Sequence, residues 1–294
     1  MEVRVLRYFL TVAREGSITG AAEALHVTQP TLSKQLMDLE QELGKKLFIR
    51  GNRKITLTEE GLFLRRRAQE IIELTDKTRA EFQNTDEMVS GDIYIGGGET
   101  EGMRLAGKII YKLRARYPEI RYHLFSGNAI DVAERLDKGL LDFGIFIEPA
   151  DITKYEFLKL PTMDTWGLLM RKDSPLSGHK TIKPKDLAGL PLLASRQAIA
   201  HNDLSGWLGK DHENLNIIAT YNLLYNASLM VEEQVGYALC LDKIIPEHNR
   251  SVLCFRPLEP RVEVGHHIAW KKYQVFSRAA ETFLEALQEE IVLL

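Results

Sequence analysis

Residues 17–44 read SITGAAEALHVTQPTLSKQLMDLEQELG and carry the pattern of two short helices joined by a tight corner. Ser17 suits the N-cap of the first helix, because its hydroxyl can accept a hydrogen bond from a free N–H of the first turn. Apolar residues at the i, i+3, i+4 and i+7 positions predict one buried face on this helix: Ile18, Ala21, Ala22 and Leu25. The two alanines allow a second helix to approach closely.

The second helix has its own start and stop signals. Thr28 can cap it, Pro30 suits the first turn because its missing N–H is not needed there, and Gly44 can end it. A row of leucines predicts the buried face: Leu32, Leu36, Leu39 and Leu43. Polar side chains gather at the N-terminal end, which a recognition helix presents to base edges in the major groove. The candidate DNA contacts on this helix are Thr28, Gln29, Pro30, Thr31, Ser33 and Lys34.

The segment that follows is strongly basic. Residues 45–58 predict a short hairpin with a Gly-Asn-Arg-Lys tip, which would form a wing beside the helices. Residues 45–67 hold eight Lys or Arg and two Glu, a net charge of +6, whereas residues 91–294 hold 24 basic and 27 acidic residues. A solvated face is the usual explanation of such a run, but beside a paired-helix element it favours phosphate contact through Arg50, Arg53 and Lys54.

A third, longer helix is predicted from Glu59 to about residue 87. At about 1.5 Å per residue it would extend roughly 40 Å, and its apolar stripe is too long for a small winged domain to cover. The stripe therefore predicts pairing with a second copy of the chain. Packing of this helix against its own chain is the alternative.

Together these motifs resemble the LysR-type transcriptional regulators. The resemblance rests on LRYFLTVAREGSITGAAEALHVTQPTLSKQLMDLEQELGKKLFIR, on TLTEEG after the wing, and on the later pattern from GDIYIGGGE to KYQVF. It spans essentially the whole chain. It implies a dimeric or tetrameric winged helix-turn-helix protein that binds double-stranded promoter DNA, acts on transcription by RNA polymerase, and responds to a small molecule in a C-terminal domain.

The composition agrees with this interpretation. The chain of 294 residues is 45% hydrophobic and 27% charged, which is enough for two globular domains. The net charge of −3 excludes a uniformly basic nucleic-acid coat, so DNA contact must depend on the local basic patch. No apolar run reaches membrane-spanning length, and the first residues form a charged amphipathic pattern rather than a signal peptide. We therefore expect a cytoplasmic protein.

From Gly91 onward strand patterns alternate with helical ones, which predicts an α/β domain with a mostly parallel sheet. We expect a winged helix-turn-helix domain at 1–58, a linker helix for dimerisation at 59–90 and an effector domain at 91–294. The family resemblance implies two hinged lobes similar to periplasmic solute-binding proteins. Lobe I would comprise about 91–162 and 267–294, and lobe II about 163–266.

Candidate effector contacts follow from the rule that ligands lie beyond the carboxyl ends of parallel strands. The rule selects the short stretches 98–101, 126–128, 146–148, 195–197, 202 and 225–227. Matching them to the family pattern favours Thr100, Ser126, Asn128, Phe146, Arg196, Asn202 and Asn226, although Ser and Asn at helix starts are usually caps and Phe146 can be core.

The charge of the effector is a separate question, because Glu99 and Glu101 flank Thr100 and would repel an anion. The effector is then cationic or zwitterionic. Alternatively, both glutamates face solvent and Arg196 binds a carboxylate in bidentate fashion.

The sequence offers no catalytic constellation, and we expect neither an enzyme nor a metal or other cofactor beyond the effector. His266 and His267 are neighbours in a predicted strand, so their side chains face opposite ways and make a poor chelate. Cys240 and Cys254 lie in apolar surroundings and are predicted to be buried. The alternative functions are a redox sensor or a solute-binding module without base readout.

Overall fold

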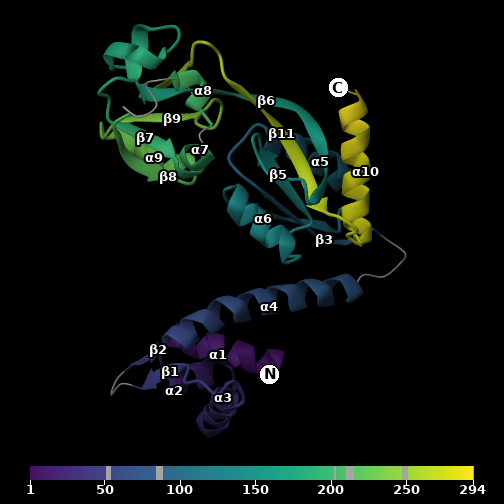
Figure 1. Cartoon of the computed structure of the whole chain (residues 1–294). Helices are drawn as coiled ribbons and strands as arrows, with labels where there is room; N and C mark the ends of the chain where they lie inside the picture. Colours follow the sequence, from purple (N-terminus) through teal and green to yellow (C-terminus); the bar gives the residue numbers. More distant parts are fainter. Residues whose placement is uncertain (51–53, 84–88, 202, 210–214, 247–250, 294) are drawn as a thin grey trace. The chain divides into compact units, whose positions relative to one another are not determined.

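The computed structural model describes residues 1–50, 54–83, 89–201, 203–209, 215–246 and 251–293. The chain divides into two compact units, Met1–Gln83 and Asn84–Leu294 (Figure 1). Among the described residues, no helix is both long and apolar enough to cross a membrane.

The first unit is a small helical bundle with a two-stranded wing. Its elements are α1 (Val3–Glu15), α2 (Ile18–Ala24), α3 (Gln29–Leu43), β1 (Phe48–Arg50), β2 (Ile55–Leu57) and α4 (Glu59–Gln83). Phe9 and Val12 of α1 pack with Ala21 of α2 and Leu32 of α3 in one core, which Leu64 and Ala68 of α4 complete. The predicted helix pair and hairpin are confirmed, and β1 pairs antiparallel with β2.

Capping sets the helix boundaries in this unit. The Ser17 hydroxyl accepts a hydrogen bond from Gly20 N–H, the Thr28 hydroxyl accepts one from Thr31 N–H, and Gly44 ends α3 in the left-handed region. The prediction that Leu43 faces the core is wrong, because its side chain is 39% exposed. Leu43 is the last residue of α3 and lies beyond the turn that packs on α1 and α2.

Glu40 joins α3 to the wing. Its buried carboxylate accepts hydrogen bonds from Leu47 N–H at 2.8 Å and Phe48 N–H at 3.3 Å, and pairs with Lys46 Nζ at 2.8 Å. Burial raises the pKa of Glu40, but these hydrogen bonds and the Lys46 charge lower it more, so the pKa lies below its ordinary value of 4.5. The carboxylate therefore stays ionised and fixes the wing against α3.

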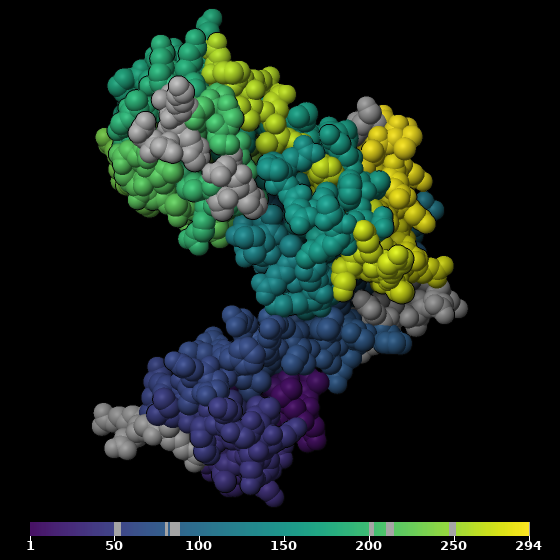
Figure 2. Space-filling view, viewed as in Figure 1, coloured from purple at the N-terminus to yellow at the C-terminus, as the bar shows by residue number. Residues whose placement is uncertain are grey.

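The second unit consists of two lobes (Figure 2). Lobe I contains β3 (Gly91–Gly97), α5 (Gly102–Arg116), β4 (Ile120–Ser126), α6 (Ala129–Asp137), β5 (Phe143–Ile147) and α10 (Arg278–Leu293). The helices α5 and α10 cover one face of its sheet around Phe143 and Phe283, and α6 covers the other.

Lobe II follows the same plan. It contains β7 (Leu192–Ser195), α7 (Arg196–His201), α8 (Ser205–Leu208), β8 (Ile217–Tyr221), α9 (Leu224–Glu232), β9 (Tyr237–Leu241) and β10 (Leu253–Pro257). Short 3-10 turns at Pro175–Gly178 and Pro184–Leu187 complete it. Helix α9 packs on one face of the sheet, and Leu204 and Leu208 lie in the core on the other.

Two long strands, β6 (Tyr155–Arg171) and β11 (Glu263–Lys271), run through both lobes as antiparallel neighbours. The described sheet has the order β4-β3-β5-β11-β6-β9-β7-β8, and β10 also pairs with β6. The prediction of a mostly parallel sheet holds for β4-β3-β5 and β8-β7-β9 alone. Strands β6, β11 and β10 pair antiparallel, since β6 and β11 carry the chain between the lobes in opposite directions.

Replacing Glu40 with Ala should lower the unfolding free energy of the first unit by about 2 kcal/mol, because two backbone N–H groups lose their acceptor. The tryptophans, Trp166, Trp207 and Trp270, all belong to the second unit. In urea unfolding of the full chain, far-ultraviolet circular dichroism should therefore show an earlier transition while tryptophan fluorescence keeps its midpoint.

The loss of unfolding free energy caused by Glu40→Ala should depend on pH. Because folding lowers the pKa of Glu40, its stabilisation is present above the unfolded value of 4.5 and disappears as the pH falls through the folded value. Asp38→Ala, which removes an exposed carboxylate from the same helix, is the matched control. An equal loss of stability in that control would contradict the role assigned to Glu40.

Candidate functional site

The N-terminal turn of α3 presents the side chains that the sequence assigns to DNA. Thr31 N–H donates to the Thr28 hydroxyl at 3.4 Å, and the two hydroxyl oxygens lie 2.8 Å apart, so the cap holds the turn in place. Ser33 is half-buried, whereas the other candidates are exposed: Thr28, Gln29, Pro30, Thr31 and Lys34. This turn is free to meet a base edge.

The wing places further cations in the same unit. Lys54 precedes β2 with its side chain exposed, and its aliphatic part lies over Gly16, where an added Cβ would be 3.2 Å from Lys54 Cε. Arg50 is the last residue of β1. Arg53 lies outside the described residues.

A cavity of about 90 Å³ opens between the two lobes of the second unit. Lobe I contributes its strand ends and the start of α6, including Glu99, Asn128, Phe146 and Glu148. Lobe II contributes the residues Ser195, Gln197, Asp203, Tyr221, Leu224 and Cys240, and Trp166 enters from β6. The walls combine aromatic rings with a few polar groups, as is typical of a small-molecule site.

Hydrogen bonds connect the lobes across this cavity. Ala129 N–H, in the first turn of α6, donates to Gln197 Oε1 at 3.0 Å. Leu224 N–H, at the start of α9, donates to the Glu99 carboxylate. The residue before α9 is Leu223, which has no side chain that can cap a helix, so Glu99 from the opposite lobe takes that role.

Only some of the predicted effector residues line the cavity in the structure. Asn128 and Phe146 line the cavity, although Asn128 also caps α6 through Ile130 N–H and Asp131 N–H. Ser126, Arg196 and Asn226 are exposed and do not belong to the described cavity lining. Asn202 lies outside the described residues.

Thr100 is not among the described cavity-lining residues and belongs to a polar cluster where β6 and β11 pass between the lobes. Its hydroxyl donates to Asp164 Oδ2 at 2.6 Å and lies 2.6 Å from His266 Nε2. His266 Nδ1 lies 2.7 Å from the Thr162 hydroxyl, and His266 Nε2 lies 3.1 Å from Asp164 Oδ2. The family pattern favours Thr100 as an effector contact, and that stays a prediction; in the structure its hydroxyl bonds this buried carboxylate and imidazole.

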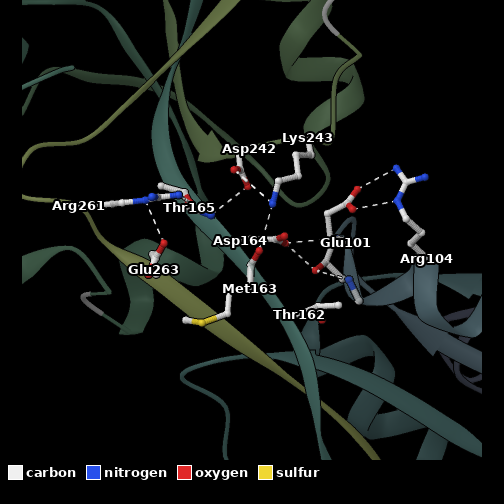
Figure 3. Close-up of polar contacts among 12 residues, drawn as sticks. Glu101, Arg104, Thr162, Met163, Asp164, Thr165, Asp242, Lys243, Arg261 and Glu263 are labelled. Carbon is white, nitrogen blue, oxygen red and sulfur yellow. Dashed lines mark hydrogen bonds and ion pairs between the residues drawn. The ribbon is translucent and has the colours of Figure 1, made fainter. Parts of the chain in front are cut away.

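The side chains of Asp164 and His266 are both fully buried. Burial raises the pKa of Asp164, but hydrogen bonds from His266 and Thr100 lower it more, so the pKa lies below its ordinary value of 3.8. Figure 3 shows Asp164 beside Glu101, whose backbone N–H also donates to Asp164, whereas the Glu101 side chain turns toward Arg104. The cluster therefore ties β6, β11 and the start of α5 together.

Cys240 and Cys254 are both buried free thiols, as predicted. Burial raises the pKa of the Cys240 thiol, which disfavours the thiolate that redox chemistry requires. Among the described residues, no group of three or more His, Cys, Asp or Glu side chains is arranged to hold a metal ion.

Comparison with known proteins assigns both units. The family "Bacterial regulatory helix-turn-helix protein, lysR family" matches residues 3–62, and the family "LysR substrate binding domain" matches residues 86–291. The chain belongs to the LysR family.

Relatives in this family align over nearly the whole chain. The transcriptional regulator BsdA of Bacillus subtilis (strain 168) is 32% identical, with 97% of this chain and 99% of BsdA covered. The Hca operon transcriptional activator HcaR of Escherichia coli (strain K12) is 27% identical, with 99% of this chain and 98% of HcaR covered. Full-length CbnR, solved with its target DNA, has the same fold with a TM-score of 0.75 at 20% identity, covering 98% of this chain and 99% of CbnR.

The protein is thus a LysR-type transcriptional regulator with a helix-turn-helix DNA-binding domain and an effector-binding domain. The relatives BsdA and HcaR are both named as regulators of transcription. The comparisons support a DNA-binding regulator and not a solute-binding or redox-sensing module without a DNA-binding function.

Replacing Asp164 with Ala should lower the unfolding free energy of the LysR effector unit by about 3–5 kcal/mol, because His266 loses its buried partner. Thr100→Ala should cost about 1 kcal/mol, since it removes a hydroxyl from the same cluster. Tryptophan fluorescence during urea unfolding measures both changes. Glu263→Ala, which removes the exposed partner of Arg261, should leave the midpoint in place, and a shift there as large as for Asp164→Ala would contradict the assignment.

Proposed function

We propose that this LysR-family regulator reads promoter DNA with the first turn of α3, contacts phosphates through the wing, and binds its effector in the cavity between the lobes. The observation that carries the proposal is the exposed polar turn of α3 beside the basic segment at 45–67. Gln29 and Thr31 would contact bases, while Lys34, Arg50, Arg53 and Lys54 would contact phosphates or guanine.

The effector acts by preferring one arrangement of the lobes. Because hydrogen bonds connect the lobes across the cavity, a ligand that binds there changes the balance between open and closed forms. The protein would act in the cytoplasm at promoters, where RNA polymerase is its further partner, and would need no cofactor besides the effector. The relative HcaR is named an activator.

Binding to a promoter fragment tests base readout. The fragment comes from mapping the protein on its own genomic DNA. Gln29→Ala should weaken binding to that fragment by about 10- to 100-fold while leaving affinity for random DNA unchanged. Lys54→Ala should weaken binding to both kinds of DNA and reduce the slope of affinity against salt by about one phosphate contact.

Fluorescence anisotropy with labelled DNA gives these affinities. Lys108→Ala, which removes an exposed cation from α5 in the other unit, is the charge-matched control and should change neither affinity. Equal affinity for cognate and random DNA in the unaltered protein would overturn the recognition-helix assignment.

We also propose that α4 pairs with a second copy of the chain. Its apolar side chains Leu62, Phe63 and Leu74 are 55%, 56% and 41% exposed, and Phe82 is 87% exposed. Such a row is expected to find a partner, because a soluble surface rarely leaves it uncovered. A dimer would set two α3 helices at repeated spacing along DNA.

Sedimentation velocity tests the pairing. Leu74→Glu should convert the dimer to a monomer, since it places a charge in the apolar row. Val275→Glu, at a site 94% exposed outside α4, should leave the oligomeric state unchanged. A monomer in the unaltered chain, or a dimer that survives Leu74→Glu with undiminished stability, would contradict the proposal.

A further inference from the structure

The charge of the cavity lining restricts the class of effector. Glu99, Glu148 and Asp203 line the cavity, whereas none of its described lining residues is Lys, Arg or His. In a partly enclosed site, carboxylates repel an anion and attract a cation more strongly than at the protein surface.

No cationic side chain among the described cavity-lining residues neutralises the charge of Glu99. Its carboxylate accepts the N–H of Leu224, which is a dipole and not a full charge. Glu101, two residues later, differs: its carboxylate makes two hydrogen bonds with Arg104, both at 2.9 Å, and its pKa is lowered by this partner. Of the two glutamates that flank Thr100, only Glu99 lines the cavity.

The negative charge of the Glu148 carboxylate is only weakly balanced by nearby positive charge. Lys159 Nζ lies 3.9 Å from its carboxylate, but the Lys159 side chain is 67% exposed, and such pairs contribute little. His267 Nε2 lies 3.5 Å away, and burial lowers the pKa of His267, so this imidazole is mainly neutral at neutral pH. The Glu148 charge is therefore only weakly neutralised by these two neighbours.

The alternative of an anionic effector bound by Arg196 has no geometric basis. Arg196 is exposed at the start of α7 and is not part of the described cavity wall, although its neighbours Ser195 and Gln197 are. No guanidinium among the described lining residues is placed to form a bidentate pair with a carboxylate.

A second, apolar cavity of about 70 Å³ adjoins the first inside lobe II. Trp166, Ser195 and Ala198 line both cavities. The remaining walls of the second cavity are aliphatic: Ala194, Ile199, Leu204, Leu208, Leu215, Ile217 and Leu239. The two adjoining cavities of about 90 Å³ and 70 Å³ are together of the size of an engineered apolar cavity of about 150 Å³ that binds benzene, whereas the second cavity alone is too small for a ring.

We infer that the effector is a small organic cation, with an ammonium group bound by Glu99 and Glu148 and a compact apolar group of ring size that spans the junction of the two cavities beside Trp166. This inference rests on the proposed role of the cavity as the effector site. Phe146, Trp166 and Tyr221 also line the cavity, and the face of an aromatic ring can attract a cation.

Three probes of equal ring size test the charge class: benzylamine, benzyl alcohol and benzoate. Calorimetric titration of the full chain at neutral pH should give benzylamine an affinity about tenfold above that of benzyl alcohol, with benzoate the weakest. Methylamine, which leaves the apolar cavity empty, should bind at least about tenfold more weakly than benzylamine.

Substitutions locate the binding. Glu99→Gln and Glu148→Gln should each weaken the binding of benzylamine by roughly fivefold or more and leave the binding of benzyl alcohol unchanged. The reason is that the new amide still accepts the N–H of Leu224 or of Gly265 but carries no charge. Glu101→Gln is the matched control and should bind benzylamine like the unaltered chain. Unchanged promoter binding by each variant shows that it folds.

The outcomes separate the two proposals. Benzoate binding as tightly as benzylamine, or a benzylamine affinity unchanged in both glutamine variants, would overturn the cationic class and leave the effector site in place. Failure of all three ring probes to bind at millimolar concentration, with promoter binding intact, would overturn both the cationic class and the cavity as effector site.

Discussion

The antiparallel pairing of β6 with β11 is the constraint on which the effector unit depends. Both strands belong to both lobes, and their register shifts between Gly265 and His266, beside the buried pair of Asp164 and His266. A buried pair of this kind is costly to leave half-satisfied, so it holds the two strands and the start of α5 in one arrangement. The cavity walls are strand and helix ends that leave this shared region, so its geometry sets how far apart Glu99 and Leu224 can lie.

Sequence reasoning located most of the cavity and part of its lining, since the favoured residues Asn128 and Phe146 lie in its wall. The strand-end rule selected the stretches 98–101, 146–148 and 195–197, and each of them contributes to the cavity wall. Within those stretches the family pattern favoured Thr100 and Arg196, whereas Glu99 and Gln197 line the cavity. The rule works because it depends on sheet topology, while the choice within a stretch depends on side-chain partners distant in sequence. Asp164 and His266, which bind Thr100, are 64 and 166 residues away from it.

The DNA-binding unit was more predictable because its signals are local. Ser17, Thr28 and Gly44 act within one turn of their own helices, and the structure has the helices where those residues put them. Glu40 could not be found in this way, since its partners Leu47 and Phe48 lie on the wing and its charge resembles that of its exposed neighbours. Trp166, Asp203, Tyr221 and Cys240 were likewise missed as cavity residues, because strand periodicity marks such residues as core or loop and does not show that a space lies beside them.

Glu99 has two roles that oppose each other, and this opposition can couple ligand binding to lobe arrangement. Its carboxylate caps α9 from the opposite lobe and also faces the cavity. A cation that binds Glu99 without displacing Leu224 N–H adds a second contact to the closed form and favours it, since a carboxylate has acceptor sites for more than one donor. A cation that displaces that N–H removes a lobe contact and favours the open form. The sign of the regulation therefore depends on which oxygen of Glu99 the ligand uses, because a ligand shifts the equilibrium only by its difference in affinity for the two forms.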